Sequence, residues 1–457
     1  MSVFVFNPFA EGYIAHGKGF TPVKRQAMLA NDLANLPQFL CRPDDIVLLE
    51  KRPAVEFLSA LKQGGFSLPE FVELRKGRID PGSNLCHRKI GGLRPWAWGP
   101  DSMELLEPLF ANVTGEARTP SERFNDSISR LYSKAWSAAF LRTVLSHCHA
   151  DDKAQTAGAG RRHLRTPGWA EPWLCTEHEA GVAVDTLEGA LGAIAAIRGR
   201  GHHRVVAKRA LGLAGHNAIR LWEPEVLASQ RQWLARALQK GCQVVIEPWL
   251  ERELDFSVQL EMGPRKLKLC GYTGLINDPK GQFQANLAAA NYDQRIPGNV
   301  VALFREPAEI SGRLQSLYHD ILSLLEEELQ RAGFLGPVGI DAFVYRTSGG
   351  YRIKPVVEIN PRYTMGRLTV ELMKHTCPGS YGLFRLVNRA QARAKGFADL
   401  AGYAHRLREQ LPLRLEGEPV HRIWEGALCL NDPGQAQVCL ATFEVGRTLN
   451  QLLGKGE

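Results

Sequence analysis

A hairpin with a polar strand end constrains the fold of this chain more than any other part of its sequence. Two apolar runs flank the turn sequence Arg-Thr-Ser-Gly-Gly at 346–350, a pattern typical of a β-hairpin. Side chains alternate along a strand, so we expect Glu358, Asn360 and Arg362 on one face and their neighbours in the core. The sequence therefore predicts a polar surface at the end of the second strand.

This surface has the chemistry of a cation site. Asp341 lies near the start of the first strand, and antiparallel pairing brings it beside Glu358 and Asn360. Two carboxylates and an amide are ligands that suit Mg²⁺. Arg362 is suited to holding a phosphate or a carboxylate bidentately. The alternative is a capped hairpin whose surface carboxylates pair with Arg362 and Arg367.

Asp341 and the strand from Glu358 to Arg362 resemble the metal-binding end of the ATP-grasp superfamily, in which an acidic residue and a Glu-x-Asn-x-Arg strand hold Mg·ATP. The motifs cover roughly residues 125–375, and the first 120 residues resemble the superfamily by architecture only. The resemblance implies an α/β and α+β protein: an N-terminal pre-ATP-grasp parallel α/β unit followed by the two-lobed ATP-grasp fold. Many relatives have glutamate where this chain has Asp341, so the number of Mg²⁺ or Mn²⁺ ions is left open.

Two upstream lysines match the family's phosphate-binding positions. Lys208 ends a short apolar strand before a loop containing Gly212 and Gly215, and a strand-end cation with a mobile loop can close over phosphates. Lys134 lies on an expected helix over 126–145, where the alternative is a solvated side chain. Whether His216 in the loop contacts the ligand is left open.

The resemblance also places the nucleotide base. The strand ending at 243–250 corresponds to the family's adenine hinge, and it would bind ATP through Glu247, Trp249 and Leu250. Asp255, in the strand that follows, is the candidate for an acidic residue near the ribose or the metal. A surface aspartate is the alternative for that position.

The chain is expected to divide into three parts. Residues 1–120 alternate strand-like and helix-like runs, as in a parallel α/β unit, and the segments 7–18 and 91–96, the latter with Arg94, are candidate substrate loops. Residues 121–378 form the core, with a lid at about 160–250, and 379–457 form a C-terminal cap.

Two helices are expected near the end of the core and in the cap. Residues 364–374 are predicted to be helical, with backbone N–H groups that could hold an anion. Whether Arg367 in this helix contacts substrate is left open. The segment 381–394 is also predicted to be a helix.

Composition excludes several classes of protein. The 457 residues include no apolar run long enough for a membrane span. The net charge of +8 comes without a Lys/Arg block interleaved with aromatic residues, which argues against nucleic-acid binding. Nine cysteines without a Cys-x-x-Cys pair favour a reduced, cytoplasmic protein. Small-molecule partners are expected, no membrane partner is expected, and homo-oligomer formation is left open.

The leading hypothesis from the resemblance is an ATP-dependent carboxylate–amine ligase that forms ADP and phosphate through an acyl-phosphate, acting on an amino acid, peptide or similar metabolite. Lys208 and Arg362 would be its catalytic cations. Two alternatives remain: a phosphotransferase that stops at phosphorylation, and a regulatory protein that binds a nucleotide without turnover.

Overall fold

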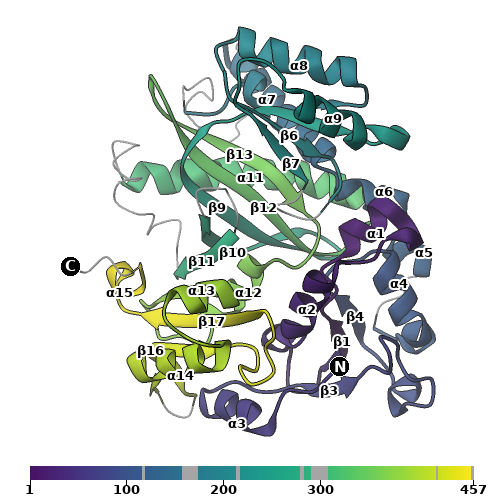
Figure 1. Cartoon of the computed structure of the whole chain (residues 1–457), viewed down its shortest axis with the longest axis vertical. Coiled ribbons are helices and arrows are strands. Elements are labelled where there is room, and N and C mark those ends of the chain that lie inside the picture. Colours follow the sequence, from purple (N-terminus) through teal and green to yellow (C-terminus); the bar gives the residue numbers. More distant parts are fainter. Residues whose placement is uncertain are drawn as a thin grey trace.

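The computed structural model describes residues 1–115, 119–156, 173–212, 217–277, 283–289, 307–417 and 420–453. These residues form three sheets, one parallel and two antiparallel, with helices packed on them (Figure 1). The predicted fold class, a parallel α/β unit followed by a two-lobed α+β core, is confirmed. Among the helices of these ranges, none is long and apolar enough to cross a membrane.

The N-terminal unit contains a four-stranded parallel sheet in the order β3-β2-β1-β4. Its elements are β1 (Ser2–Val5), α1 (Ala10–His16), α2 (Lys24–Asp32), β2 (Ile46–Leu49), α3 (Val55–Gln63), β3 (Glu70–Glu73), β4 (Gly92–Pro95), α4 (Pro100–Leu106) and α5 (Pro120–Arg123). The prediction that 7–18 and 91–96 are loops is wrong, because they contain α1 and β4. Gly12 permits close packing of α1, since a Cβ there would lie 2.5 Å from the Phe20 ring. The buried side chain of Leu93 packs β4 into the apolar core of this unit.

The helix predicted over 126–145 is two helices, α6 (Asp126–Leu131) and α7 (Lys134–Thr156). They meet at Tyr132, which is buried and donates its hydroxyl hydrogen bond to the Trp98 carbonyl over 2.7 Å. Between the helices, the Ser133 hydroxyl accepts from the Ala135 backbone N–H over 3.2 Å, as an N-cap residue does. The apolar periodicity of the segment did not indicate this break. Lys134 consequently lies in the first turn of α7, and its backbone N–H donates to the Ala210 carbonyl.

A small antiparallel sheet has the order β5-β8-β6-β7 and is covered by two helices. Its elements are β5 (Val182–Val184), α8 (Leu187–Gly199), β6 (Val205–Arg209), β7 (Ala218–Leu221), α9 (Ala228–Ala237) and β8 (Val244–Pro248). Apolar side chains of both helices and of all four strands form a separate core. This lobe therefore supplies Lys208 and Glu247 from adjacent, rigidly packed strands.

The large sheet has nine strands in the order β13-β12-β9-β10-β11-β14-β17-β16-β15. Its strands are β9 (Glu251–Met262), β10 (Leu267–Asn277), β11 (Phe283–Ala289), β12 (Gly336–Thr347), β13 (Gly350–Asn360), β14 (Tyr381–Asn388), β15 (Arg414–Glu416), β16 (Arg422–Cys429) and β17 (Cys439–Gly446). The predicted hairpin is confirmed as β12–β13, with Asp341 opposite Glu358.

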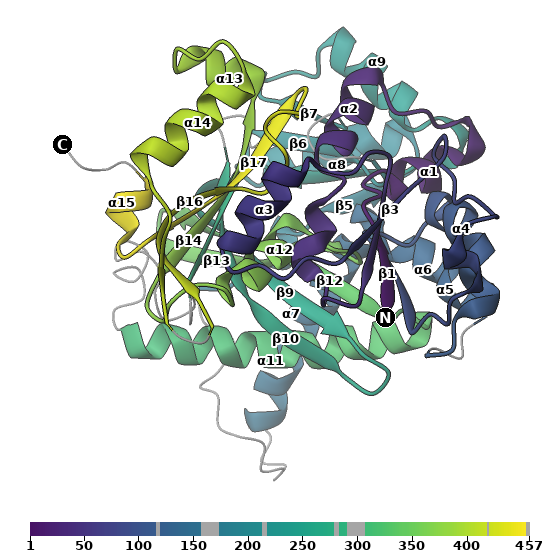
Figure 2. The same ribbon diagram turned by 90° about the horizontal axis from the view of Figure 1, so that it is seen from below.

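Helices cover both faces of the large sheet. The long helix α11 (Pro307–Ala332) crosses one face (Figures 1 and 2), where Leu317 packs with Val258 and Leu260 of β9. On the opposite face α12 (Met365–Met373) approaches so closely that a Cβ at Gly366 would lie 2.5 Å from Gln259. The helix predicted over 364–374 is thus confirmed.

The helix predicted over 381–394 is wrong for most of its length. Residues 381–388 are the strand β14, paired with β11 and β17, and only α13 (Arg389–Ala394) is helical. Pairing on both edges determines β14, and this information is not local to the segment. The remaining helices are α14 (Leu400–Gln410) and α15 (Leu449–Leu453). The C-terminal strands share one apolar core with the N-terminal unit.

Candidate active site

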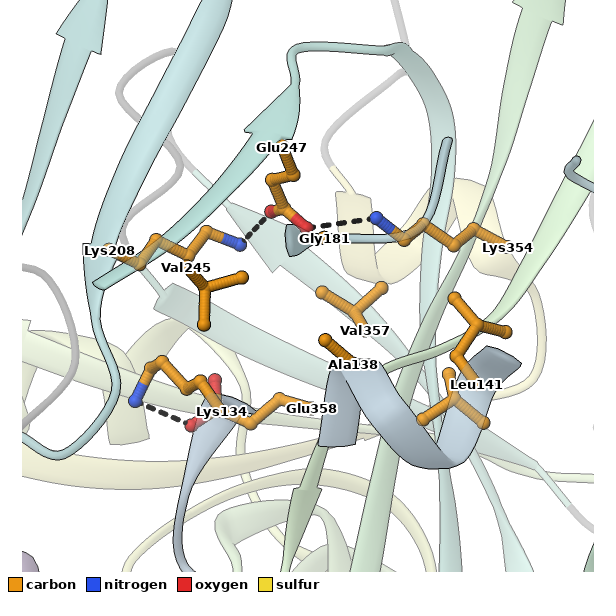
Figure 3. Close-up of a pocket in the computed structure, with 11 residues that line it drawn as sticks. Lys134, Ala138, Leu141, Gly181, Lys208, Val245, Glu247, Lys354, Val357 and Glu358 are labelled. Atoms are coloured by element: carbon orange, nitrogen blue, oxygen red, sulfur yellow. Dashed lines mark hydrogen bonds and ion pairs between the residues drawn. The ribbon is translucent and has the colours of Figure 1, made fainter. Parts of the chain in front are cut away.

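A pocket lies between the small sheet and the large sheet (Figure 3). Its walls combine apolar side chains with two lysine–glutamate clusters. The lining residues are Lys134, Ala138, Leu141, Gly181, Lys208, Val245, Glu247, Lys354, Val356, Val357 and Glu358. The pocket therefore brings together four of the residues predicted from sequence, Lys134, Lys208, Glu247 and Glu358.

Glu247 lies at one end of the pocket between two lysines. Lys208 pairs with its Oε1, and the Nζ of Lys354 lies 2.9 Å from its Oε2. Burial alone would raise the pKa of Glu247, but the two ammonium charges lower the pKa well below its usual range. Burial lowers the pKa of Lys208, an effect that Glu247 only partly opposes. Glu247 is therefore an ionised, fixed hydrogen-bond acceptor.

Lys134 and Glu358 form the second cluster. The Nζ of Lys134 lies 2.9 Å from the Glu358 Oε1 and donates a second hydrogen bond to the Gly212 carbonyl over 3.2 Å. Burial opposes ionisation of both groups, yet their mutual attraction raises the pKa of Lys134 and lowers that of Glu358. The pair thus keeps a partly buried carboxylate charged at the predicted metal position.

The predicted metal ligands lie on one surface. Asp341 faces Glu358 across the β12–β13 ladder and accepts a 3.1 Å hydrogen bond from the Asn360 amide. Burial and the charge of Glu358 raise the pKa of Asp341 to about 6. Two adjacent carboxylates that repel each other, with an amide beside them, fit a hard divalent cation. Asp341, Glu358 and Asn360 would hold that ion.

Arg362 connects this surface to the N-terminal unit. Its Nη2 donates to the Asn360 Oδ1 over 2.8 Å, and its Nε donates to the Glu11 carboxylate over 3.1 Å. Burial would lower the pKa of Arg362, but Glu11 and Glu358 raise it. The guanidinium is therefore fixed next to the metal ligands.

Other predicted residues lie beyond the pocket lining. The Arg220 guanidinium lies over the Trp249 ring, with its Cζ 4.7 Å from the centroid of that ring. Leu250 is buried in the core. Asp255 accepts from the Arg252 guanidinium over 3.0 Å and from the Asn277 amide over 3.1 Å. Both contacts of Asp255 are those of a structural carboxylate.

The glycine loop is described only in part. Gly212 is described and has a φ of 142°; Gly215 and His216 lie outside the described residues. Arg367 donates to Glu261 over 2.8 Å and to Glu371 over 3.0 Å. The contact with Glu261 of β9 connects α12 to the sheet, whereas the contact with Glu371 lies within α12. Arg94 lies half-buried in β4.

Sequence reasoning missed two residues of this site, Lys354 and Glu11. Lys354 lies in an apolar strand two alternating positions before Glu358, so the same alternation could have indicated it. Glu11 is 351 residues from Arg362, and no local signal connects the two.

Comparisons with known proteins give structural similarity only. No family model matches the chain, and no curated protein matches it. N5-carboxyaminoimidazole synthetase from Staphylococcus aureus is similar with a TM-score of 0.46 and 10% identity, over 92% of this chain and 93% of that one. L-amino acid ligase from Bacillus licheniformis has a TM-score of 0.44 and 9% identity, over 99% and 95%.

Biotin carboxylase from Campylobacter jejuni, solved as a β,γ-ATP complex, is similar with a TM-score of 0.42 and 12% identity, over 79% of this chain and 72% of that one. Similarity at these levels does not bear on the substrate or the reaction of the present chain.

Proposed function

We propose that this protein is an ATP-grasp ligase that uses Mg·ATP to join a carboxylate to an amine. The observation that carries the proposal is the convergence, in one pocket, of residues from distant parts of the chain. Lys134, Lys208 and Glu358 come from α7, the small sheet and the large sheet, and all three line that pocket. Their types and order match the motifs that resemble the superfamily.

The charges of the site are suited to phosphoryl transfer. Lys134 and Lys208 are placed to bind phosphate oxygens, and Asp341, Glu358 and Asn360 would hold the metal ion. Bound Mg·ATP would supply the phosphoryl group that activates the substrate carboxylate. Such reactions depend mainly on positioning and on neutralising charge.

Arg362 has the geometry of a residue that stabilises the transferred group. Its guanidinium is held by Glu11 and Asn360, so little side-chain freedom remains to be lost when it binds an anion. The Arg362 guanidinium lies beside the proposed metal ligands, so it is a fixed cation between the nucleotide pocket and α1 of the N-terminal unit. We assign the substrate carboxylate to this junction.

The proposal is tested by a turnover screen with Mg²⁺, ATP, amino acids and short peptides, singly and in pairs. ADP, phosphate and product mass are measured together. ADP that forms only with a carboxylate–amine pair, with a product one water lighter than their sum, is the expected result. Phosphorylated product without an amine would identify a phosphotransferase, and ATP binding without turnover by any pair would contradict the ligase assignment.

A further inference from the structure

Lys354 is a charged residue in the otherwise apolar stretch from Ile353 to Val357 within β13. Its side chain is 2% exposed, and it projects from β13 toward Glu247 (Figure 3). Two of its three N–H groups have partners among the described residues: the Glu247 carboxylate at 2.9 Å and the Glu179 carbonyl at 3.0 Å. Within the described ranges, the third N–H of Lys354 has no hydrogen-bond partner and could bind a ligand.

The cluster of Lys208, Glu247 and Lys354 carries two positive charges and one negative charge. Burying a single ion pair already costs desolvation free energy, and an additional buried cation increases that cost. A pair of Lys208 and Glu247 alone would be neutral. The second lysine therefore adds a positive charge that Glu247 alone does not balance.

The surroundings of this cluster combine apolar walls with a charged end. Ala138 and Leu141 of α7 lie near Val357, and Glu247 with its lysines lies at the polar end (Figure 3). A Cβ at Gly181 would lie 2.5 Å from Val245 and 3.5 Å from the Glu247 Oε2. Only glycine therefore leaves this end of the pocket open.

We propose that Lys354 is a specificity-determining residue for the nucleotide base. By holding the Oε2 of Glu247, it fixes the carboxylate so that its remaining lone pairs accept from the exocyclic amino group of adenine. Its third N–H is placed to donate to a ring nitrogen of the same base. A carboxylate held by Lys208 alone could rotate, and the amino group would lose its fixed acceptor. This inference rests on the proposed function, since it requires that the pocket bind ATP.

The test compares two nucleotides in two proteins. Dissociation constants are measured by calorimetry for ATP and for purine riboside triphosphate, which lacks the amino group, with Mg²⁺ present. A hydrogen bond to a charged acceptor is worth about 10- to 100-fold in affinity, so we expect wild type to prefer ATP by that factor. In Lys354→Met the preference should fall to about twofold or less.

The ratio of the two affinities separates base recognition from a structural role. A merely structural lysine would weaken both nucleotides equally and leave the preference for ATP intact, and that result would overturn the inference. Equal affinity of wild type for both nucleotides would also overturn it. If wild type binds neither nucleotide, the proposed function itself fails.

Two further variants support the comparison. In Lys354→Gln the side chain is about one bond too short to reach Glu247. This variant should therefore lose the preference for ATP, as Lys354→Met should, and it replaces the methionine variant if that one does not fold. Lys374→Met removes a lysine whose side chain is 66% exposed, and it should keep the wild-type preference. Loss of the preference in Lys374→Met would overturn the assignment to Lys354.

Discussion

Asp341→Asn is expected to stabilise the fold at neutral pH while it removes a metal ligand. Burial and the charge of Glu358 raise the pKa of Asp341 from 3.8 to about 6. Each pKa unit corresponds to about 1.4 kcal/mol, so ionised Asp341 lowers the free energy of unfolding by roughly 3 kcal/mol. Asparagine is the uncharged isostere, and this value is therefore the upper limit of the gain.

The sign of the pKa shift sets the pH dependence. Below about pH 4 Asp341 is protonated in both the folded and unfolded states, so the two proteins should be equally stable. Between about pH 4 and pH 6 the folded state binds the proton more tightly, and the stability of wild type falls with rising pH relative to the variant. Urea denaturation with a metal chelator, at about pH 5 and pH 7.5, measures this divergence.

A variant no more stable than wild type at about pH 7.5 would refute the argument that Asp341 and Glu358 repel each other across the ladder. Asp185→Asn is the matched control, because Asp185 is exposed and should change stability by less than about 0.5 kcal/mol. Added Mg²⁺ should stabilise wild type more than Asp341→Asn, because a ligand that binds the folded state raises its stability.

Three further substitutions test the remaining groups. Glu358→Gln should lower Mg²⁺-dependent ADP formation by about 100-fold with the fold retained. Circular dichroism checks the fold. ADP formation at the wild-type rate would contradict the assignment of Glu358 to the metal site. Lys208→Met should raise the dissociation constant of ATP by about 10- to 100-fold through a lost charge-assisted contact, and an unchanged value in calorimetry would contradict its role. Glu11→Gln should lower the free energy of unfolding by about 1–3 kcal/mol because Arg362 loses its charged partner, and urea denaturation equal to that of wild type would show that the pair is not stabilising.

Local pattern determined the most important part of the site. The turn at 346–350 and the alternation of side chains predict the hairpin. The register that starts at this turn would pair Asp341 with Val356, and a register shift between Asp341 and Phe343 pairs it with Glu358 instead. The strand carrying Lys208 could also be predicted, because its short run contains two adjacent valines and is bounded by polar residues and a glycine-containing loop. The residue types of the proposed metal ligands are therefore visible in the sequence, whereas the pairing of Asp341 with Glu358 depends on the register shift.

Two features of the fold depend on the tertiary structure and could not be predicted from local sequence patterns. The segment 381–388 has apolar residues that suit a helix or a strand, and pairing with β11 and β17 selected the strand. The chain breaks between α6 and α7 at Tyr132 and Ser133, which places Lys134 in the first turn of α7, and Tyr132 there donates a hydrogen bond to the Trp98 carbonyl.

The electrostatics of the pocket also belong to the tertiary structure. The sequence alone identified Lys134, Lys208, Glu247 and Glu358 as separate candidates, and Lys134 and Glu247 were candidates only through the resemblance to the superfamily. Only the folded chain shows that these groups pair with one another, that Lys354 shares Glu247 with Lys208, and that Glu11 holds Arg362. Three of these contacts, Lys134 with Glu358, Lys354 with Glu247 and Glu11 with Arg362, join residues more than a hundred positions apart. Their energies depend on burial, which exists only after the lobes have packed.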